Sequence, residues 1–214
     1  MIDVPEEYEK VAVFDLDGTL TTTNSPYEVL NDEINVRPSF NTEMYVRFSL
    51  GEFSYSEWIS KVVMEWKKRD ASKENFENVF EKCNETRQGT EQLLELLDES
   101  FYTVIVSGSP DILSGRMAEK LGMDHHIDTV DVIFDGDSLD DYTIKNGYDG
   151  DKEKYVKDLD EEVYAFGNAS NDVGMVEAAD RGFMVPSSSL DYKSIDAEFV
   201  GEIDEIESYL RGDV

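Results

Sequence analysis

The sequence predicts an α/β fold in which helices cover both faces of a parallel sheet, with a helical segment inserted after the first strand. Short apolar, β-branched runs, typical of strands buried on both faces, alternate with amphipathic stretches. A long stretch rich in helix formers interrupts this alternation directly after the first run. Because ligands of such sheets bind at the carboxyl ends of the strands, those ends are where a site is expected.

The core elements follow in chain order. Three strands are predicted, at residues 11–15 (VAVFD), 102–108 (YTVIVSG) and 163–168 (VYAFGN). Three amphipathic helices are predicted, at residues 89–100, 110–122 and 171–182. Right-handed crossovers through helices are the usual way to connect parallel strands, so this order gives a doubly wound sheet.

The stretch from residue 26 to residue 87 contains large apolar residues and no convincing strand, as in EMYVRFSLGEFSYSEWISKVVMEW. We interpret it as a small helical cap. The expected division is therefore a core of residues 1–23 and 88–214 and a cap of residues 24–87. A second irregular piece, residues 130–144, has two short extended runs around Asp-Gly and predicts a hairpin or flap.

The charge balance is strongly acidic. Asp and Glu number 49 against 19 Lys and Arg, a formal net charge of -30 at pH 7. Such a field repels polyanions, so we expect neither nucleic acid nor an anionic membrane surface as a partner. The acids are spread along the whole chain, and a compact domain so charged repels itself unless concentrated salt screens it. We therefore hypothesise that the protein works in the salt-loaded cytoplasm of an extreme halophile, and the alternative is an ordinary acidic protein. The halophile hypothesis predicts that unfolding becomes harder as KCl rises to molar levels.

The start of the chain and its hydropathy bear on where the protein resides. The first ten residues, MIDVPEEYEK, are acidic and lack the basic and apolar regions of a secretory signal. No apolar run approaches the ~20 residues of a membrane helix. We expect a cytoplasmic protein.

Two aspartates follow the first predicted strand, in VAVFDLDGTLT. Side chains two positions apart in a strand point to the same side, so Asp15 and Asp17 would converge, and Gly18 permits the chain to turn. Two carboxylates held together are costly unless a cation or a shared proton relieves them. On its own this pattern is also compatible with a turn or a helix cap.

Four motifs in order resemble those of the haloacid dehalogenase superfamily of phosphotransferases. DLDGTLT resembles the first, VIVSGS the second, GDKEKYVKDL the third and YAFGNASNDVGM the fourth. With the helical insertion, this resemblance covers nearly the whole chain, and it is greatest to the phosphoserine-phosphatase-like subgroup. It implies a Rossmann-like three-layer α/β/α core, a helical cap and a small phosphorylated metabolite as substrate.

The resemblance also implies catalytic roles. Asp15 would be the nucleophile that forms an aspartyl-phosphate, and Asp17 the general acid and base. Ser107 and Gly108 would bind the phosphoryl oxygens, and Lys152 would balance their charge. A serine in SGS is also common in plain turns. Lys145 and Lys154 are alternatives to Lys152, which is preferred for its position at the start of a helix.

The same resemblance implies a Mg²⁺ ion, a hard cation suited to carboxylate and phosphate oxygens. Its ligands would be Asp15, the backbone carbonyl of Asp17, and Asn168 and Asp172 from the fourth motif. That motif usually begins Gly-Asp, whereas here Asn168 follows the glycine. An amide oxygen carries no charge, so Asp172 would be the main carboxylate from this loop.

The predicted cap departs from the phosphoserine phosphatases. Asn24 stands near their substrate-binding Glu and Ser60 near their Arg, with Lys61 adjacent. Without a guanidinium, bidentate recognition of a carboxylate is lost unless Lys61 or Arg47 substitutes. Six aromatic residues either line a pocket for a less polar leaving group or form the core of the cap: Tyr45, Phe48, Phe53, Tyr55, Trp58 and Trp66.

Three functions are compatible with these features. The first is a Mg²⁺-dependent phosphatase of a small phosphomonoester, with phosphoserine as the best named candidate. The second is a phosphotransferase or mutase of the same superfamily, which passes the phosphoryl group to an acceptor other than water. The third is a catalytically weak member that binds phosphorylated ligands, a reading motivated by Asn168.

Overall fold

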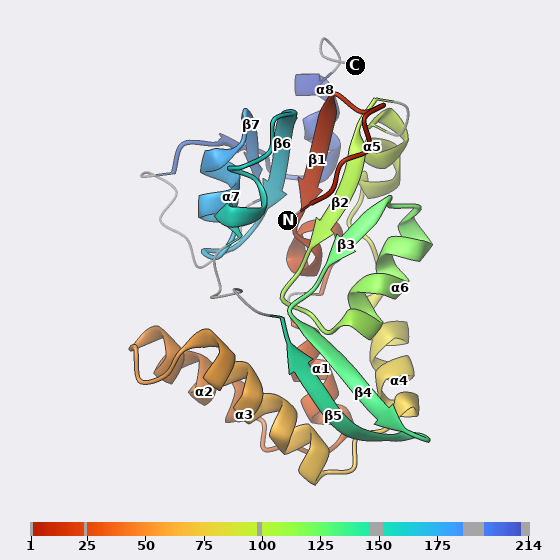
Figure 1. The fold of residues 1–214 in the computed structure, drawn as a ribbon, viewed down its shortest axis with the longest axis vertical. Coiled ribbons are helices and arrows are strands. Elements are labelled where there is room, and N and C mark those ends of the chain that lie inside the picture. Colours follow the sequence, from red (N-terminus) through yellow and green to blue (C-terminus); the bar gives the residue numbers. More distant parts are fainter. Residues whose placement is uncertain (1, 24, 98–99, 146–151, 186–194, 211–214) are drawn as a thin grey trace.

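The computed structural model describes residues 2–23, 25–97, 100–145, 152–185 and 195–210. Its centre is a six-stranded sheet in the order β3-β2-β1-β6-β7-β8, in which every neighbouring pair is parallel (Figure 1). The strands are β1 Lys10–Phe14, β2 Tyr102–Val106, β3 His125–Ile127, β6 Glu162–Gly167, β7 Arg181–Met184 and β8 Glu198–Phe199. The predicted α/β fold with a parallel sheet is confirmed.

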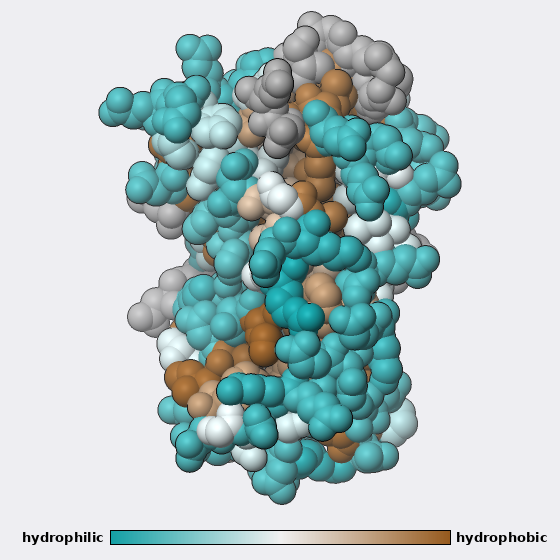
Figure 2. All heavy atoms as spheres, turned by 90° about the vertical axis from the view of Figure 1, so that its right-hand side faces the viewer, coloured by the Kyte–Doolittle hydropathy of each residue, from teal (hydrophilic) through white to brown (hydrophobic). Residues whose placement is uncertain are grey.

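Alternate residues of the central strand face two different helical layers. Ala12 and Phe14 pack with α5 Thr90–Leu97, α6 Asp111–Leu121, the turn Ile203–Glu205 and α8 Ile206–Leu210. Val11 and Val13 pack with α7 Val173–Ala178 and with residues beside the turn Glu153–Tyr155. The apolar run of β1 is therefore buried on both sides, which explains why it shows no polar alternation. No helix in the described part of the chain is long and apolar enough to cross a membrane. Hydrophilic residues cover most of the face of the molecule shown in Figure 2.

The insertion after β1 is helical. Its helices are α1 Pro26–Glu33, α2 Phe40–Ser49, α3 Tyr55–Lys68 and α4 Lys73–Cys83. Helix α3 begins with a capping box, in which the Ser54 side chain accepts from the Glu57 backbone and the Glu57 carboxylate accepts from the Ser54 backbone. Its apolar stripe, which includes Ile59, Val63 and Trp66, is buried at helical spacing. This stripe forms the core of the insertion.

The predicted hairpin at residues 130–144 is confirmed, with β4 Val130–Asp135 antiparallel to β5 Ser138–Ile144. It lies beside the helical insertion, away from the large sheet (Figure 1). Lys73 N donates to Asp137 O at 2.9 Å and Leu139 N donates to Ala71 O at 2.8 Å. The hairpin thus extends the cap from a segment assigned to the core, and the division at residues 24 and 87 stays a prediction.

The predicted helix at 171–182 is wrong at its end. Helix α7 stops at Ala178, and Arg181 and Gly182 already belong to β7. A Cβ on Gly182 would lie 2.3 Å from the carbonyl oxygen of Val176. The glycine therefore allows the strand to pass closely against the helix before it. Strands β3, β7 and β8 were not predicted, because runs of two to four residues are too short to show a period.

Candidate active site

Neighbouring strands of the sheet bring the sequence-predicted residues together at their carboxyl ends. Ser107 follows β2, Asp15 follows β1 and Asn168 follows β6. The Asp15 amide donates to the carbonyl of Phe166 at 2.9 Å, which continues the β1–β6 ladder to the first site residue. The three residues therefore meet at one edge of the sheet, as the α/β topology predicts.

A single tight turn, Leu16–Leu20, positions the two aspartates. Gly18 has φ of 86°, a left-handed conformation that favours glycine. The Thr21 amide closes the turn by donating to Leu16 O at 3.1 Å. Thr19 Oγ1 donates to Asp15 Oδ2 at 2.7 Å, so the turn also holds the carboxylate that precedes it.

Lys152 bridges two buried carboxylates. Its Nζ lies 2.5 Å from Asp15 Oδ1 and 2.7 Å from Asp172 Oδ1, and its side chain is fully buried. A buried ammonium is stabilised only by such close partners.

The two alternative lysines have other neighbours. Lys145 Nζ pairs with Asp128 Oδ1 at 2.7 Å and with Asp131 Oδ1 at 3.2 Å. Lys154 Nζ lies 5.1 Å from the centroid of the adjacent Tyr155 ring.

Asp172 organises the loop after β6. Its Oδ2 accepts from the amides of Asn168 at 3.0 Å and Ala169 at 2.9 Å, while Oδ1 contacts Lys152. A Cβ on Gly167 would lie 2.4 Å from the Cβ of Asp172, so a glycine is required at this approach. Asp172 thus positions both Lys152 and the loop, and its predicted role as a metal ligand stays a prediction.

Two serines hold Asp17. Ser109 Oγ donates to Asp17 Oδ2 at 2.5 Å, and Ser107 Oγ donates to the same oxygen at 3.2 Å. Ser107 Oγ in turn accepts from the Ser109 amide at 3.0 Å. Ser109 was not predicted as a site residue, although it is the second serine of the SGS motif. Gly108 lies between them, and its carbonyl accepts from Tyr27 OH at 2.9 Å.

The cluster carries more negative than positive charge. Burial, together with the nearby Asp172, raises the pKa of Asp15 to about 7, although Lys152 opposes this shift. Burial likewise raises the pKa of Asp17 to about 6, opposed by the hydrogen bond from Ser109. Three carboxylates thus share one lysine, and a divalent cation would relieve the excess charge.

Oxygen atoms available at the site suit a hard cation. No group of three or more His, Cys, Asp or Glu side chains placed to hold a metal occurs among the described residues. A metal would therefore need amide and backbone oxygens in addition to carboxylates. Asn168, only 4% exposed, lines the pocket together with Asp15 and supplies such an amide. This mixed oxygen set fits Mg²⁺.

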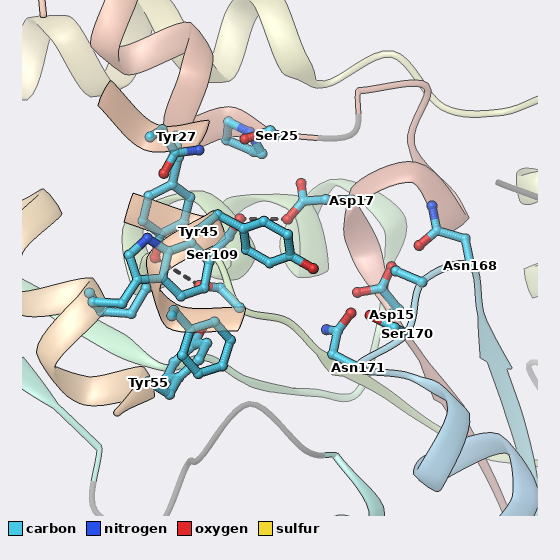
Figure 3. Close-up of a pocket in the computed structure, with 17 residues that line it drawn as sticks. Asp15, Asp17, Ser25, Tyr27, Tyr45, Tyr55, Ser109, Asn168, Ser170 and Asn171 are labelled. Atoms are coloured by element: carbon cyan, nitrogen blue, oxygen red, sulfur yellow. Dashed lines mark hydrogen bonds between the residues drawn. The ribbon is translucent and has the colours of Figure 1, made fainter. Parts of the chain in front are cut away.

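A pocket of about 420 Å³ opens in front of the aspartates. Figure 3 shows Asp15, Asp17, Asn168 and Asn171 on one side and aromatic side chains on the other. Five aromatic residues line it: Tyr27, Tyr45, Phe48, Tyr55 and Trp58. The cap aromatic residues are therefore divided between the pocket and the core, because Trp66 is instead fully buried in the core of the insertion.

The structure does not bring the predicted substrate residues of the cap that it describes into the pocket. Asn24 lies outside the described residues. Neither Ser60 nor Lys61 lines the pocket, and Lys61 Nζ lies 5.3 Å from the centroid of the Phe53 ring. Asn41, which was not predicted as a site residue, does line the pocket.

The sequence of this chain is similar to those of known proteins. The family model described as haloacid dehalogenase-like hydrolase matches residues 12–177. The phosphoserine phosphatase of Methanocaldococcus jannaschii is 24% identical over 184 residues, which cover 81% of this chain and 84% of that protein.

Solved structures share the fold. A phospho-aspartyl intermediate analogue of phosphoserine phosphatase has a TM-score of 0.76 at 21% identity, covering 95% of this chain and 99% of that one. A HAD-family hydrolase from Salmonella enterica serovar Typhi has a TM-score of 0.82 at 18% identity, covering 98% of this chain and 74% of that one. At these identities the likeness concerns the architecture, including the helical insertion after the first strand.

Proposed function

We propose that this chain, which belongs to the haloacid dehalogenase-like hydrolases, is a Mg²⁺-dependent phosphatase of a small phosphomonoester that works through an aspartyl-phosphate on Asp15. The observation that carries the proposal is the buried bridge of Lys152 between Asp15 and Asp172 at the strand ends, with Asp17 beside it. Phosphoserine is the best named candidate, because the similar protein of Methanocaldococcus jannaschii is a phosphoserine phosphatase.

The residues divide the reaction into two displacements. The Asp15 carboxylate attacks phosphorus, and the bond between phosphorus and the alcohol oxygen breaks as Asp17 gives that oxygen its proton. Asp17, now ionised, then takes a proton from water as the water oxygen attacks phosphorus. The bond between phosphorus and Asp15 breaks, which frees inorganic phosphate and restores both aspartates.

The other residues supply charge and orientation. Lys152 balances the charge of Asp15 and of the transferred group, and Ser107 with the amide of Gly108 binds phosphoryl oxygens. We assign Asp15, the Asp17 carbonyl and Asn168 as metal ligands, with Asp172 holding Lys152 and the loop. When bound, Mg²⁺ supplies positive charge that offsets the repulsion between the phosphate and the carboxylates.

Metal binding should release protons near neutral pH. Because the pKa of Asp15 is raised to about 7, a good part of this group is protonated at pH 6 in the metal-free protein. Mg²⁺ binds the carboxylate, so its apparent affinity should increase between pH 6 and pH 8. Calorimetric titration with MgCl₂ in buffers of different ionisation enthalpy measures the protons released. Equal affinity and no proton release at both pH values would contradict the assignment of Asp15 as a ligand.

Replacing Ser109 should change the acidity of Asp17. In Ser109→Ala the pKa of Asp17 should rise, because the hydrogen bond to its ionised form is lost. Since Asp17 must be protonated to assist the leaving alcohol, the fall of kcat/KM at high pH should move to higher pH. Ser114→Ala is the matched control, because Ser114 donates to Pro110 O and does not contact Asp17. An unchanged pH profile in Ser109→Ala would contradict this role of Asp17.

Phosphate release from a panel of phosphomonoesters, phosphoserine included, tests the proposal in molar KCl with Mg²⁺. Release from at least one ester that stops when EDTA removes the metal supports it. Added alcohols distinguish hydrolysis from transfer, because a phosphotransferase passes the group to the alcohol faster than to water. No release from any ester would instead favour the catalytically weak binding protein.

A further inference from the structure

The side of the pocket facing the aspartates is an aromatic wall, which we define as Tyr45, Phe48, Tyr55 and Trp58. The Trp58 ring stacks on Phe48 with centroids 5.3 Å apart and an angle of 15°. Tyr45 and Tyr55 meet Trp58 edge to face at 5.4 and 5.3 Å. Because each ring is held by others, the wall exists before any ligand binds.

The wall faces the place where the alcohol half of a substrate must lie. In-line attack by Asp15 puts the leaving oxygen on the far side of phosphorus from the carboxylate. In Figure 3 the Tyr45 ring extends from the cap side into the pocket, between the other aromatic rings and the loop of Asn171. Part of the alcohol would therefore contact these rings.

The wall offers no positive charge. Among the described residues that line the pocket there is no lysine, arginine or histidine, and the charged ones are Asp15 and Asp17. Two cations of helices α2 and α3 contact a ring outside the pocket. Arg47 Cζ and Lys61 Nζ lie 4.9 and 5.3 Å from the centroid of the Phe53 ring. A carboxylate on the alcohol would lose its hydration without gaining a charged partner.

The polar groups around the wall are neutral. Asn41 is 8% exposed, and its Oδ1 has no hydrogen-bond partner. Trp58 Nε1 is also buried and unpaired. Because an unpaired buried polar atom is unfavourable, an uncharged polar group of a ligand that reached either atom would be bound favourably.

We infer that this site prefers phosphomonoesters of uncharged alcohols that present an apolar or aromatic face to the aromatic wall, over esters whose alcohol carries a carboxylate. The inference rests on the proposed function and names the substrate class of the same site. It means that phosphoserine, although chemically competent, is a poorer substrate than a neutral ester with a ring.

Phenethyl phosphate, ethyl phosphate and phosphoserine form the test set. Phenethyl and ethyl alcohol are similar leaving groups, so their ratio of kcat/KM reports contact with the wall. We expect phenethyl phosphate to exceed ethyl phosphate by about tenfold or more, and to exceed phosphoserine. In Tyr45→Ala the ratio of phenethyl to ethyl should fall about fivefold. Val46→Ala, an exposed neighbour on α2 that does not line the pocket, should leave the ratio unchanged.

Binding of the non-hydrolysable phosphonate analogues of the phenethyl and ethyl esters, measured by calorimetry with Mg²⁺, gives a readout that needs no turnover. Tighter binding of the phenethyl analogue that weakens in Tyr45→Ala supports the inference. Hydrolysis with phosphoserine preferred, or equal affinity for the two phosphonates, overturns it and leaves the proposed phosphatase intact. Absence of hydrolysis with selective phosphonate binding would instead refute the phosphatase and keep the preference of the wall.

Discussion

Asp15→Asn should lower phosphate release by about 10⁴-fold or more, because the amide cannot form the acyl phosphate that divides the reaction into two steps. The variant should keep the fold, since asparagine has nearly the same shape and Lys152 retains its contact with Asp172 at 2.7 Å. Phosphate release under saturating substrate measures the loss. Asp131→Asn, which changes a half-exposed carboxylate outside the pocket, is the control.

Asp15→Asn should also make the metal-free protein more stable at pH 8. The pKa of Asp15 is raised from 3.8 to about 7 in the folded chain, so above pH 7 its ionised form opposes folding. Asparagine removes that cost, and the stability gain should vanish below about pH 4, where the acid is protonated in both states. Thermal unfolding with EDTA at the two pH values measures the difference. A variant with normal turnover would exclude Asp15 as the nucleophile.

Lys152→Met should destabilise the protein by about 3–5 kcal/mol and abolish turnover, because it leaves Asp15 and Asp172 buried without their shared cation. The free energy of unfolding in denaturant, measured with EDTA, gives the first effect. Lys157→Met is the control in the same segment, because Lys157 is exposed and its Nζ lies 3.9 Å from Glu153 Oε1. We expect its free energy of unfolding to change by less than about 1 kcal/mol.

A second substitution separates charge from packing in this prediction. Adding Asp172→Asn to Lys152→Met removes one of the two unpaired carboxylates, so stability should partly return while activity does not. If the single variant loses no stability, the buried bridge does not hold the site together. If the double variant remains as unstable as the single one, the loss comes from packing.

Much of the fold could be predicted from the apolar runs in this one sequence. The strands β1, β2 and β6 are buried on both faces, and this leaves a nearly continuous apolar run that is easy to find. An edge strand such as β8, which has two residues, contains no apolar run long enough to be recognised. The end of α7 was missed because it depends on the tight approach of Gly182 to Val176, a tertiary contact.

The candidate site was predictable where its residues lie at strand ends in recognisable motifs, as for Asp15, Asp17 and Ser107. Asp15 and Lys152 are 137 residues apart in the sequence, so no local pattern predicts their contact, and only the resemblance indicated that Lys152 belongs to the site. The contacts of Asp172 with the loop amides were not foreseen, because such hydrogen bonds have no sequence signature. Pocket residues of the cap depend on how its helices pack, and Asn41 was therefore not foreseen.

Detection of a phosphorylated Asp15 tests the central claim most directly. The protein is mixed with a hydrolysed phosphomonoester and Mg²⁺, quenched in acid within one turnover and digested, and the peptide that contains the DLDGTLT motif is analysed by mass spectrometry. We predict one added phosphoryl group on Asp15 in the wild type and none in Asp15→Asn. Rapid phosphate release with no phosphorylated peptide at any quench time, or with the group on another residue, would contradict the account.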